Sequence, residues 1–235
     1  MFFDFLFFDS TIILIIPTLI LSLYAQFKVK STFNRYTQVA ARSGMTGAQV
    51  AWQLLSASGI RDVEVEPIAG HLTDHYDPRD RTVRLSEAVY NETSLAAIGV
   101  AAHEVGHAVQ HSESYTPLAM RSGLFPIVNI GSRAAMPLIM IGLFIAYSEG
   151  GMGGMLLNIG IILFAFTVIF QLVTLPVEFN ASSRAIELLE RERILSYEET
   201  VPAKKVLNAA ALTYVAAAIA SIMTLIRFIL IARRR

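Results

Sequence analysis

The sequence predicts a mainly α-helical membrane protein with about four transmembrane helices and a small α+β domain built around one histidine-bearing helix. Composition is the first reason: 54% of the 235 residues are hydrophobic, 16% are charged, and the mean hydropathy is +0.53. Soluble domains carry about 25% charged residues. The second reason is a series of uncharged apolar stretches. The third is the sequence HEVGH at residues 103–107, which lies in the soluble-looking part of the chain.

Charge and cysteine content exclude several classes of function. The net charge is zero, which gives no electrostatic basis for binding a nucleic acid, so we expect no such partner. The chain has no cysteine, which excludes disulfides, thiolate metal sites and cysteine nucleophiles. Any metal ion must therefore be held by histidines and carboxylates.

The first apolar stretch covers residues 5–27 and has no charge after Asp9. About 20 apolar residues are enough to cross a bilayer. A secretory signal peptide would begin with basic residues and end at a small-residue cleavage site, whereas this chain begins with acidic and aromatic residues. We therefore predict an uncleaved N-terminal anchor.

The charges that flank this anchor predict its orientation. Acidic residues precede it and basic residues follow it directly: Asp4 and Asp9 before, Lys28, Lys30 and Arg35 after. Cytoplasmic flanks of membrane helices are enriched in Lys and Arg. We therefore expect the N-terminus outside, the following domain in the cytoplasm, and the protein in a cell membrane, most simply a bacterial inner membrane.

The soluble-looking part begins with one amphipathic helix and continues with short strands. Residues 45–58 have helical periodicity, with Thr46 as a cap and Gly59 as a stop. Residues 63–67, 71–76 and 81–86 alternate like strands, and residues 77–80 have good turn chemistry. The edge of such a sheet could pair with an extended peptide.

The histidine-bearing helix is predicted over residues 94–111, with Ser94 or Thr93 as its cap. Positions i and i+4 share one face of a helix, so His103 and His107 can offer two imidazole nitrogens to a single ion. Glu104 lies beside them, where it can act as general base toward a metal-activated water. This spacing predicts a zinc site of the kind found in zincin peptidases.

Three further apolar stretches complete the chain. Residues 124–147 contain Arg133, so we expect the span to begin after it; residues 148–154 form a flexible outside loop, and residues 155–176 form the third span. A charged helix follows, and residues 206–231 form a fourth apolar run. A fourth crossing would place the terminal arginines outside, against the charge rule, but we retain four spans.

These elements divide the chain into five predicted parts. They are an N-terminal transmembrane anchor (residues 1–28), a zincin-like domain with a small sheet and the HEVGH helix (29–123), a transmembrane hairpin (124–176), a charged helix (177–205) and a C-terminal hydrophobic helix with a basic tail (206–235).

The chain resembles the YugP-like neutral zinc metallopeptidases of bacterial membranes over nearly its whole length. The motifs that carry the resemblance are HLTDHYDPR at residues 71–79, RLS at 84–86, AAHEVGHAVQ at 101–110 and TYVAAA at 213–218. This family is in turn similar to the HtpX-type membrane endopeptidases, gluzincins whose third ligand is a glutamate on a later helix. The resemblance implies a zinc-dependent membrane protease that acts on peptides or proteins, membrane proteins among them.

The resemblance also implies a third ligand. Residues 178–185, EFNASSRA, match the later motif of the HtpX-type enzymes, which makes Glu178 the ligand. Ser182 replaces the aspartate that supports a zinc-binding histidine in those relatives. His111 continues the i, i+4 series, but it lies about 12 Å along the helix axis from His103, too far to share one ion. The remaining candidates for supporting the metal or contacting substrate are His75, Asp74, His111, Asn180 and Arg184.

The predicted function is thus a membrane-embedded zinc endopeptidase with His103, His107 and Glu178 as ligands and Glu104 as base. The alternative from another class is a non-proteolytic scaffold or assembly factor with a structural zinc ion. Structural zinc sites use four protein ligands and have no need of a glutamate between two histidines, which favours the enzyme. A protease that cuts within the bilayer fits less well, because the histidine-bearing helix follows a soluble segment and is polar in its second half.

Overall fold

The computed structural model describes residues 10–146 and 151–233, and these form two compact units. The helical unit comprises the described parts of Met1–Tyr24, Met120–Leu175 and Tyr214–Arg235. The sheet unit comprises Ala25–Ala119 and Pro176–Thr213. The acidic start of the chain, residues 147–150 of the expected loop and the last two arginines lie outside the described residues.

Within residues 10–146 and 151–233, four helices are long and apolar enough to cross a membrane, as the sequence predicts. They are α2 (Ile15–Tyr36, preceded by the 3₁₀ helix η1, Ser10–Leu14), α6 (Thr116–Ala146), α7 (Gly151–Arg191) and α8 (Tyr197–Arg233). Large apolar side chains remain exposed on α2, among them Leu19, Ile20 and Leu23. Such a surface is stable in contact with lipid and unfavourable in water. The fold is therefore that of a multi-pass membrane protein.

The long helices are more continuous than the sequence predicts. We expected the third span to end at Pro176 and a new helix to begin after it, but α7 runs through Pro176 without a break. Val177, Ala181 and Ala185 continue a buried stripe beyond the proline, and this packing outweighs the loss of one backbone hydrogen bond. Residues 151–154, expected in a flexible turn, form the first turn of α7 for the same reason: helix packing overrides local glycine content.

The helices α6 and α8 also begin earlier than expected. Helix α6 starts at Thr116 and includes Arg133, and α8 starts at Tyr197 and includes Pro202 near its beginning. Pro202 is the sixth residue of α8 and removes one intrahelical hydrogen bond, a loss that is offset by the burial of Ala203, Val206 and Leu207. A hydrophobic cluster of the helical unit joins α6, α7 and α8 through Ile139, Leu143, Leu157, Phe228 and Ile231.

The sheet unit begins with the predicted amphipathic helix, α3 (Gly47–Ala57). Its N-terminus is a capping box in which the Thr46 hydroxyl accepts from Gln49 N (3.2 Å) and the Gln49 side chain accepts from Thr46 N (2.9 Å). Gly59 follows the helix with φ +73°, the left-handed conformation that ends helices. Helix α3 therefore begins and ends where the sequence predicts.

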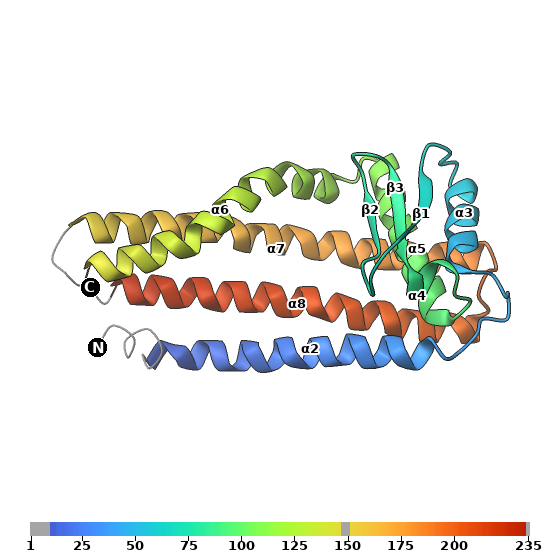
Figure 1. The fold of residues 1–235 in the computed structure, drawn as a ribbon, viewed down its shortest axis with the longest axis horizontal. Coiled ribbons are helices and arrows are strands. Elements are labelled where there is room, and N and C mark those ends of the chain that lie inside the picture. Colours follow the sequence, from blue (N-terminus) through green and yellow to red (C-terminus); the bar gives the residue numbers. More distant parts are fainter. Residues whose placement is uncertain (1–9, 147–150, 234–235) are drawn as a thin grey trace. The chain divides into compact units, whose positions relative to one another are not determined.

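Three strands form the predicted small sheet: β1 (Glu64–Ile68), β2 (His75–Asp77) and β3 (Thr82–Ser86). Their order is β1-β3-β2, with β3 parallel to β1 and antiparallel to β2 (Figure 1). Strand β2 is shorter than expected because the backbone at Leu72 has φ +58°, which no strand accommodates. Because β3 lies between the other two strands, β2 is at one edge of the sheet.

Helices α4 (Glu87–Tyr90) and α5 (Leu95–Ser112) follow the sheet. The Ser94 hydroxyl accepts from Ala97 N (3.2 Å) and caps α5 as predicted. Helix α5 contacts α3, α4 and strands β2 and β3. Most of its residues are buried in the core of the sheet unit, which fixes α5 as the scaffold on which the candidate site is built.

Candidate metal centre

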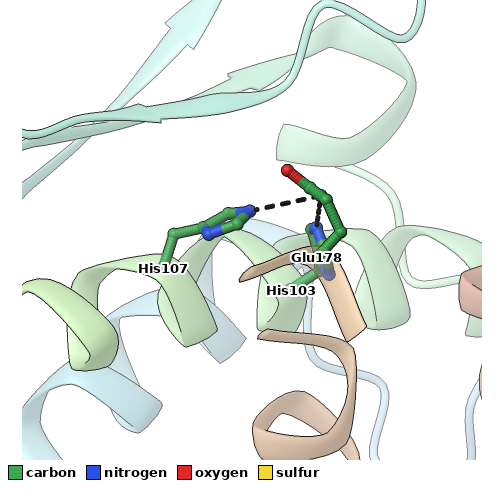
Figure 2. A group of neighbouring side chains, drawn as sticks. All are labelled: His103, His107 and Glu178. Atoms are coloured by element: carbon green, nitrogen blue, oxygen red, sulfur yellow. Dashed lines mark ion pairs between the residues drawn. The ribbon is translucent and has the colours of Figure 1, made fainter. Parts of the chain in front are cut away.

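Two helices of the sheet unit bring three potential metal ligands together. His103 and His107 project from α5 toward Glu178 of α7, as Figure 2 shows. Glu178 Oε2 lies 3.4 Å from His103 Nε2 and 3.6 Å from His107 Nε2. Among the described residues this is the group of histidines and carboxylates able to hold a metal ion, with its ligand atoms within 4.8 Å of one another.

The donor set fits zinc in type and in spacing. Two imidazole nitrogens and one carboxylate oxygen are the ligands of a catalytic zinc site. Tetrahedral zinc with bonds of about 2.0–2.1 Å separates its donor atoms by about 3.3–3.4 Å, close to the two distances measured to Glu178. Glu178 is only 2% exposed, a burial that a carboxylate tolerates when a cation or several hydrogen-bond donors face it.

The second nitrogen of each histidine is held by a polar side chain. His107 Nδ1 lies 3.0 Å from Gln110 Oε1, and His103 Nδ1 lies 3.2 Å from Ser182 Oγ. Both imidazoles therefore direct Nε2 toward Glu178. Ser182, at the position where the HtpX-type pattern has aspartate, thus contacts one of the two candidate histidine ligands, His103.

Glu104 lies beside the three ligand candidates and is buried. Burial raises the pKa of Glu104 to about 7, opposed by His103 and assisted by the charges of Glu178 and Asp74. The backbone N–H of Tyr76 donates to the Glu104 carboxylate and lowers this pKa. A cation bound by the neighbouring residues would lower it further, because an opposite charge favours the ionised form. Glu104 can therefore exchange a proton near neutral pH.

Close contact between α5 and α7 makes this arrangement possible. A Cβ atom on Gly106 would lie 2.5 Å from the backbone oxygen of Ala181, so only glycine allows α7 to approach α5 at this point. Gly106 precedes His107, and Ala181 lies three residues after Glu178. The glycine inside HEVGH thereby sets the separation of the two helices that carry the ligands.

His111 takes no part in the three-residue group. Its Nδ1 lies 2.8 Å from the Tyr76 hydroxyl, and the two rings pack at 5.9 Å. Burial raises the pKa of Tyr76 to about 12, with further contributions from Asp77 and Asp80, so this hydroxyl stays protonated beside His111 Nδ1. The pair links strand β2 to the second half of α5.

His75 and Asp74 hold the segment around β2 in place. Asp74 accepts hydrogen bonds from Ser86 N (2.7 Å) and Ser86 Oγ (3.0 Å), which ties it to the end of β3. His75 Nδ1 lies 2.8 Å from the Thr73 carbonyl oxygen. Asp74 is close enough to raise the pKa of Glu104, whereas the ring of His75 contacts the backbone of its own loop.

Asn180 and Arg184 form a network on the same face of α7. Asn180 Oδ1 accepts from Gln110 Nε2 (2.9 Å) and from Arg184 Nε (2.8 Å). Arg184 also forms an ion pair with Glu113 (2.7 Å) and lies over the Tyr115 ring. Both residues are thus connected to His107 through Gln110.

Sequence reasoning missed three residues of the site: Gln110, Gly106 and Tyr76. Gln110 lies three positions after His107 and so shares its helix face, a signal that the spacing contained. Gly106 inside an otherwise good helix is a second signal, since glycine there weakens a helix unless close packing requires it. Tyr76 gave no such signal, because its contacts with α5 depend on the path of the β2 segment.

Comparison with known proteins places the chain in a family. The family model described as "Putative neutral zinc metallopeptidase" matches residues 11–233. The chain belongs to this zinc metallopeptidase family. It is also 53% identical over 220 residues to the "Putative membrane protease YugP" of Bacillus subtilis (strain 168), covering 94% of this chain and 95% of that protein. No solved structure matches the chain significantly. The resemblance inferred from the motifs is confirmed, and zinc is the cofactor of the family.

Proposed function

We propose that this family member is a membrane-embedded endopeptidase in which His103, His107 and Glu178 hold zinc and Glu104 is the general base. The observation that carries the proposal is the position of Glu178, whose Oε2 lies 3.4 and 3.6 Å from the two Nε2 atoms. Three protein ligands are the number used by catalytic zinc sites, which leave one position for water or substrate, whereas structural sites use four.

Zinc bound at this centre would activate a water molecule and polarise a peptide carbonyl. Glu104 would take the proton from the attacking water and deliver it to the departing amine. Burial raises the pKa of Glu104 and a bound cation would lower it, so the carboxylate can be ionised to accept the proton of the water and then release it. Ser182 and Gln110 would hold the two imidazoles in their binding orientation.

The edge position of β2 supports a peptide or protein as the substrate. Strand β2 contacts α5 and pairs with β3 on one side, and its Tyr76 N–H reaches Glu104. An extended peptide that lay along this strand would therefore have its backbone beside the catalytic carboxylate. The four membrane helices favour membrane proteins as substrates. The charge bias around α2 favours a cytoplasmic position for the sheet unit.

Replacement of the general base tests this proposal. The full chain, purified in detergent, is compared with Glu104→Gln and with the control Glu92→Gln, which makes the same chemical change at an exposed residue. We expect Glu104→Gln to bind zinc stoichiometrically and to lose casein cleavage by several orders of magnitude, with Glu92→Gln unchanged. Chelation should abolish the activity of the unmodified protein, and added zinc should restore it.

Two results would contradict the proposal. Wild-type turnover in Glu104→Gln would exclude this residue as the base. A zinc-loaded protein that cleaves neither casein nor membrane-protein substrates, with or without Glu104, would favour the alternative of a scaffold with a structural ion.

A further inference from the structure

We propose that Gln110 is a positioning residue that fixes the tautomer of His107, and that Asn180 and Arg184 fix the orientation of Gln110. The inference deepens the proposed function, since it rests on His107 being a ligand through Nε2. In this network three side chains on α5 and α7, namely Gln110, Asn180 and Arg184, keep that nitrogen unprotonated and free to bind a metal ion.

Gln110 is fully buried, at 0% exposure, yet its side-chain amide uses its hydrogen-bonding groups on three partners. Its Oε1 lies 3.0 Å from His107 Nδ1. Its Nε2 lies 2.8 Å from the Val177 carbonyl oxygen and 2.9 Å from Asn180 Oδ1. A buried polar side chain with this many specific partners is costly to replace, because removing it would leave several of those partners unsatisfied.

The orientation of the amide follows from groups whose roles are fixed. Arg184 carries only donors, and its Nε donates to Asn180, so the atom of Asn180 at that point must be the oxygen. The Val177 carbonyl can only accept. Two acceptors therefore face one end of the Gln110 amide, and that end must be its NH₂ group. The opposite end, its carbonyl oxygen, then faces His107.

This orientation determines where His107 carries its proton. A carbonyl oxygen can only accept, so Nδ1 must hold a hydrogen and donate it to Gln110 Oε1. In a neutral imidazole the other nitrogen, Nε2, then has the free lone pair. Nε2 is the atom that faces Glu178 at 3.6 Å, where a metal ion would bind. The network thus selects the tautomer that binds metal.

Nδ1 of His103 faces no amide oxygen, so this histidine serves as a comparison within the same protein. Its Nδ1 contacts the hydroxyl of Ser182, and a hydroxyl can donate or accept. Ser182 therefore holds the His103 ring without determining which nitrogen is protonated. In metal-free protein Nδ1 of His107 must therefore carry a proton, whereas the Glu178 carboxylate, 3.4 Å from His103 Nε2, favours the proton of His103 on that nitrogen.

Imidazole ¹⁵N shifts measure this difference without any substitution. The full chain, labelled at its 5 histidines and freed of metal in detergent at pH 8, should show His107 with Nδ1 protonated and His103 with its proton mainly on Nε2. Assignment uses His103→Gln and His107→Gln. A mixed tautomer at His107 would overturn the inference, and this measurement remains available even if variants of Gln110 fail to fold.

Two nearly isosteric substitutions test the polarity of the network. Gln110→Met keeps the length of the side chain and removes the oxygen that accepts from His107 Nδ1, whereas Asn180→Asp keeps the oxygen that accepts from Gln110 Nε2. We expect zinc affinity, measured by competition with a chelator, to fall about 10–100-fold in Gln110→Met and to change less than about threefold in Asn180→Asp.

Equal losses of affinity in the two variants, or retention of affinity and of the His107 tautomer in Gln110→Met, would overturn the assignment. A different result would contradict the proposed function. If the unmodified protein showed the predicted tautomer but neither bound zinc nor cleaved protein, the network would stand and the proposed function would fall.

Discussion

A Cβ atom at Gly106 would lie 2.5 Å from the carbonyl oxygen of Ala181, closer than any side chain can approach a backbone atom. This contact joins the helix that carries both histidines to the helix that carries Glu178. The glycine within HEVGH is therefore as much a part of the candidate centre as its ligands, since it sets the distance across which the three donor atoms meet.

We expect Gly106→Ala to destabilise the protein by about 1–3 kcal/mol and to weaken zinc binding, because α7 must move away from α5. The matched control is Gly99→Ala in the same helix, where the nearest atom to a new Cβ is 3.6 Å away, an ordinary contact. Gly99→Ala should be neutral or stabilising, since alanine favours helix. Thermal unfolding and chelator competition measure the two effects. A Gly106→Ala protein as stable and as zinc-competent as the Gly99→Ala protein would contradict the packing argument.

Substitutions at Ser182 test whether its contact with His103 strengthens metal binding. Ser182→Ala removes the oxygen that lies 3.2 Å from His103 Nδ1, and we expect zinc affinity to fall about 10-fold. Ser182→Asp introduces a carboxylate, which accepts more strongly from Nδ1, so affinity should be kept or raised. Ser183→Ala, one residue further on the exposed side of α7, is the control and should have no effect. Equal affinities in all three variants would show that Ser182 does not support the metal.

Substitutions at Glu178 and at His111 should differ in their effect on metal binding. We expect Glu178→Ala to weaken zinc binding by at least about 10–100-fold, because it removes a proposed ligand. His111→Ala should leave the metal in place and change activity modestly, because His111 pairs with Tyr76 instead. Metal analysis after dialysis measures both. The reverse order of effects would require the centre to be rebuilt around His111.

The orientation in the membrane can be tested with single cysteines, since the native chain has none. The charge bias around α2 predicts that the start of α7 faces outside and its charged end faces the cytoplasm. A membrane-impermeant maleimide added to intact cells should label Met152→Cys and leave Arg191→Cys unlabelled until the cells are opened; both positions are well exposed. Labelling of Arg191→Cys alone in intact cells would invert the topology and place the sheet unit outside.

Several features of this protein follow from local sequence alone. The capping box at Thr46, the cap of α5 at Ser94 and the apolar helices were predictable because each depends on residues within a few positions of one another. The HEVGH spacing is also a local feature, because residues i and i+4 lie on one face of any α-helix. The family resemblance pointed to Glu178, which local pattern by itself could not distinguish from an ordinary helix glutamate.

Only the tertiary structure decided how the two helices meet. Local rules predicted a break at Pro176, but the buried face of α7 continues through it and places Glu178 in the middle of a long helix. The roles of Gln110, Gly106 and Tyr76 likewise depend on contacts with residues far away in sequence. Hydrogen bonds and backbone contacts across two helices have no periodic signature in one chain, because either partner alone is compatible with many environments. The candidate ligands were therefore readable from sequence, and the groups that orient them were not.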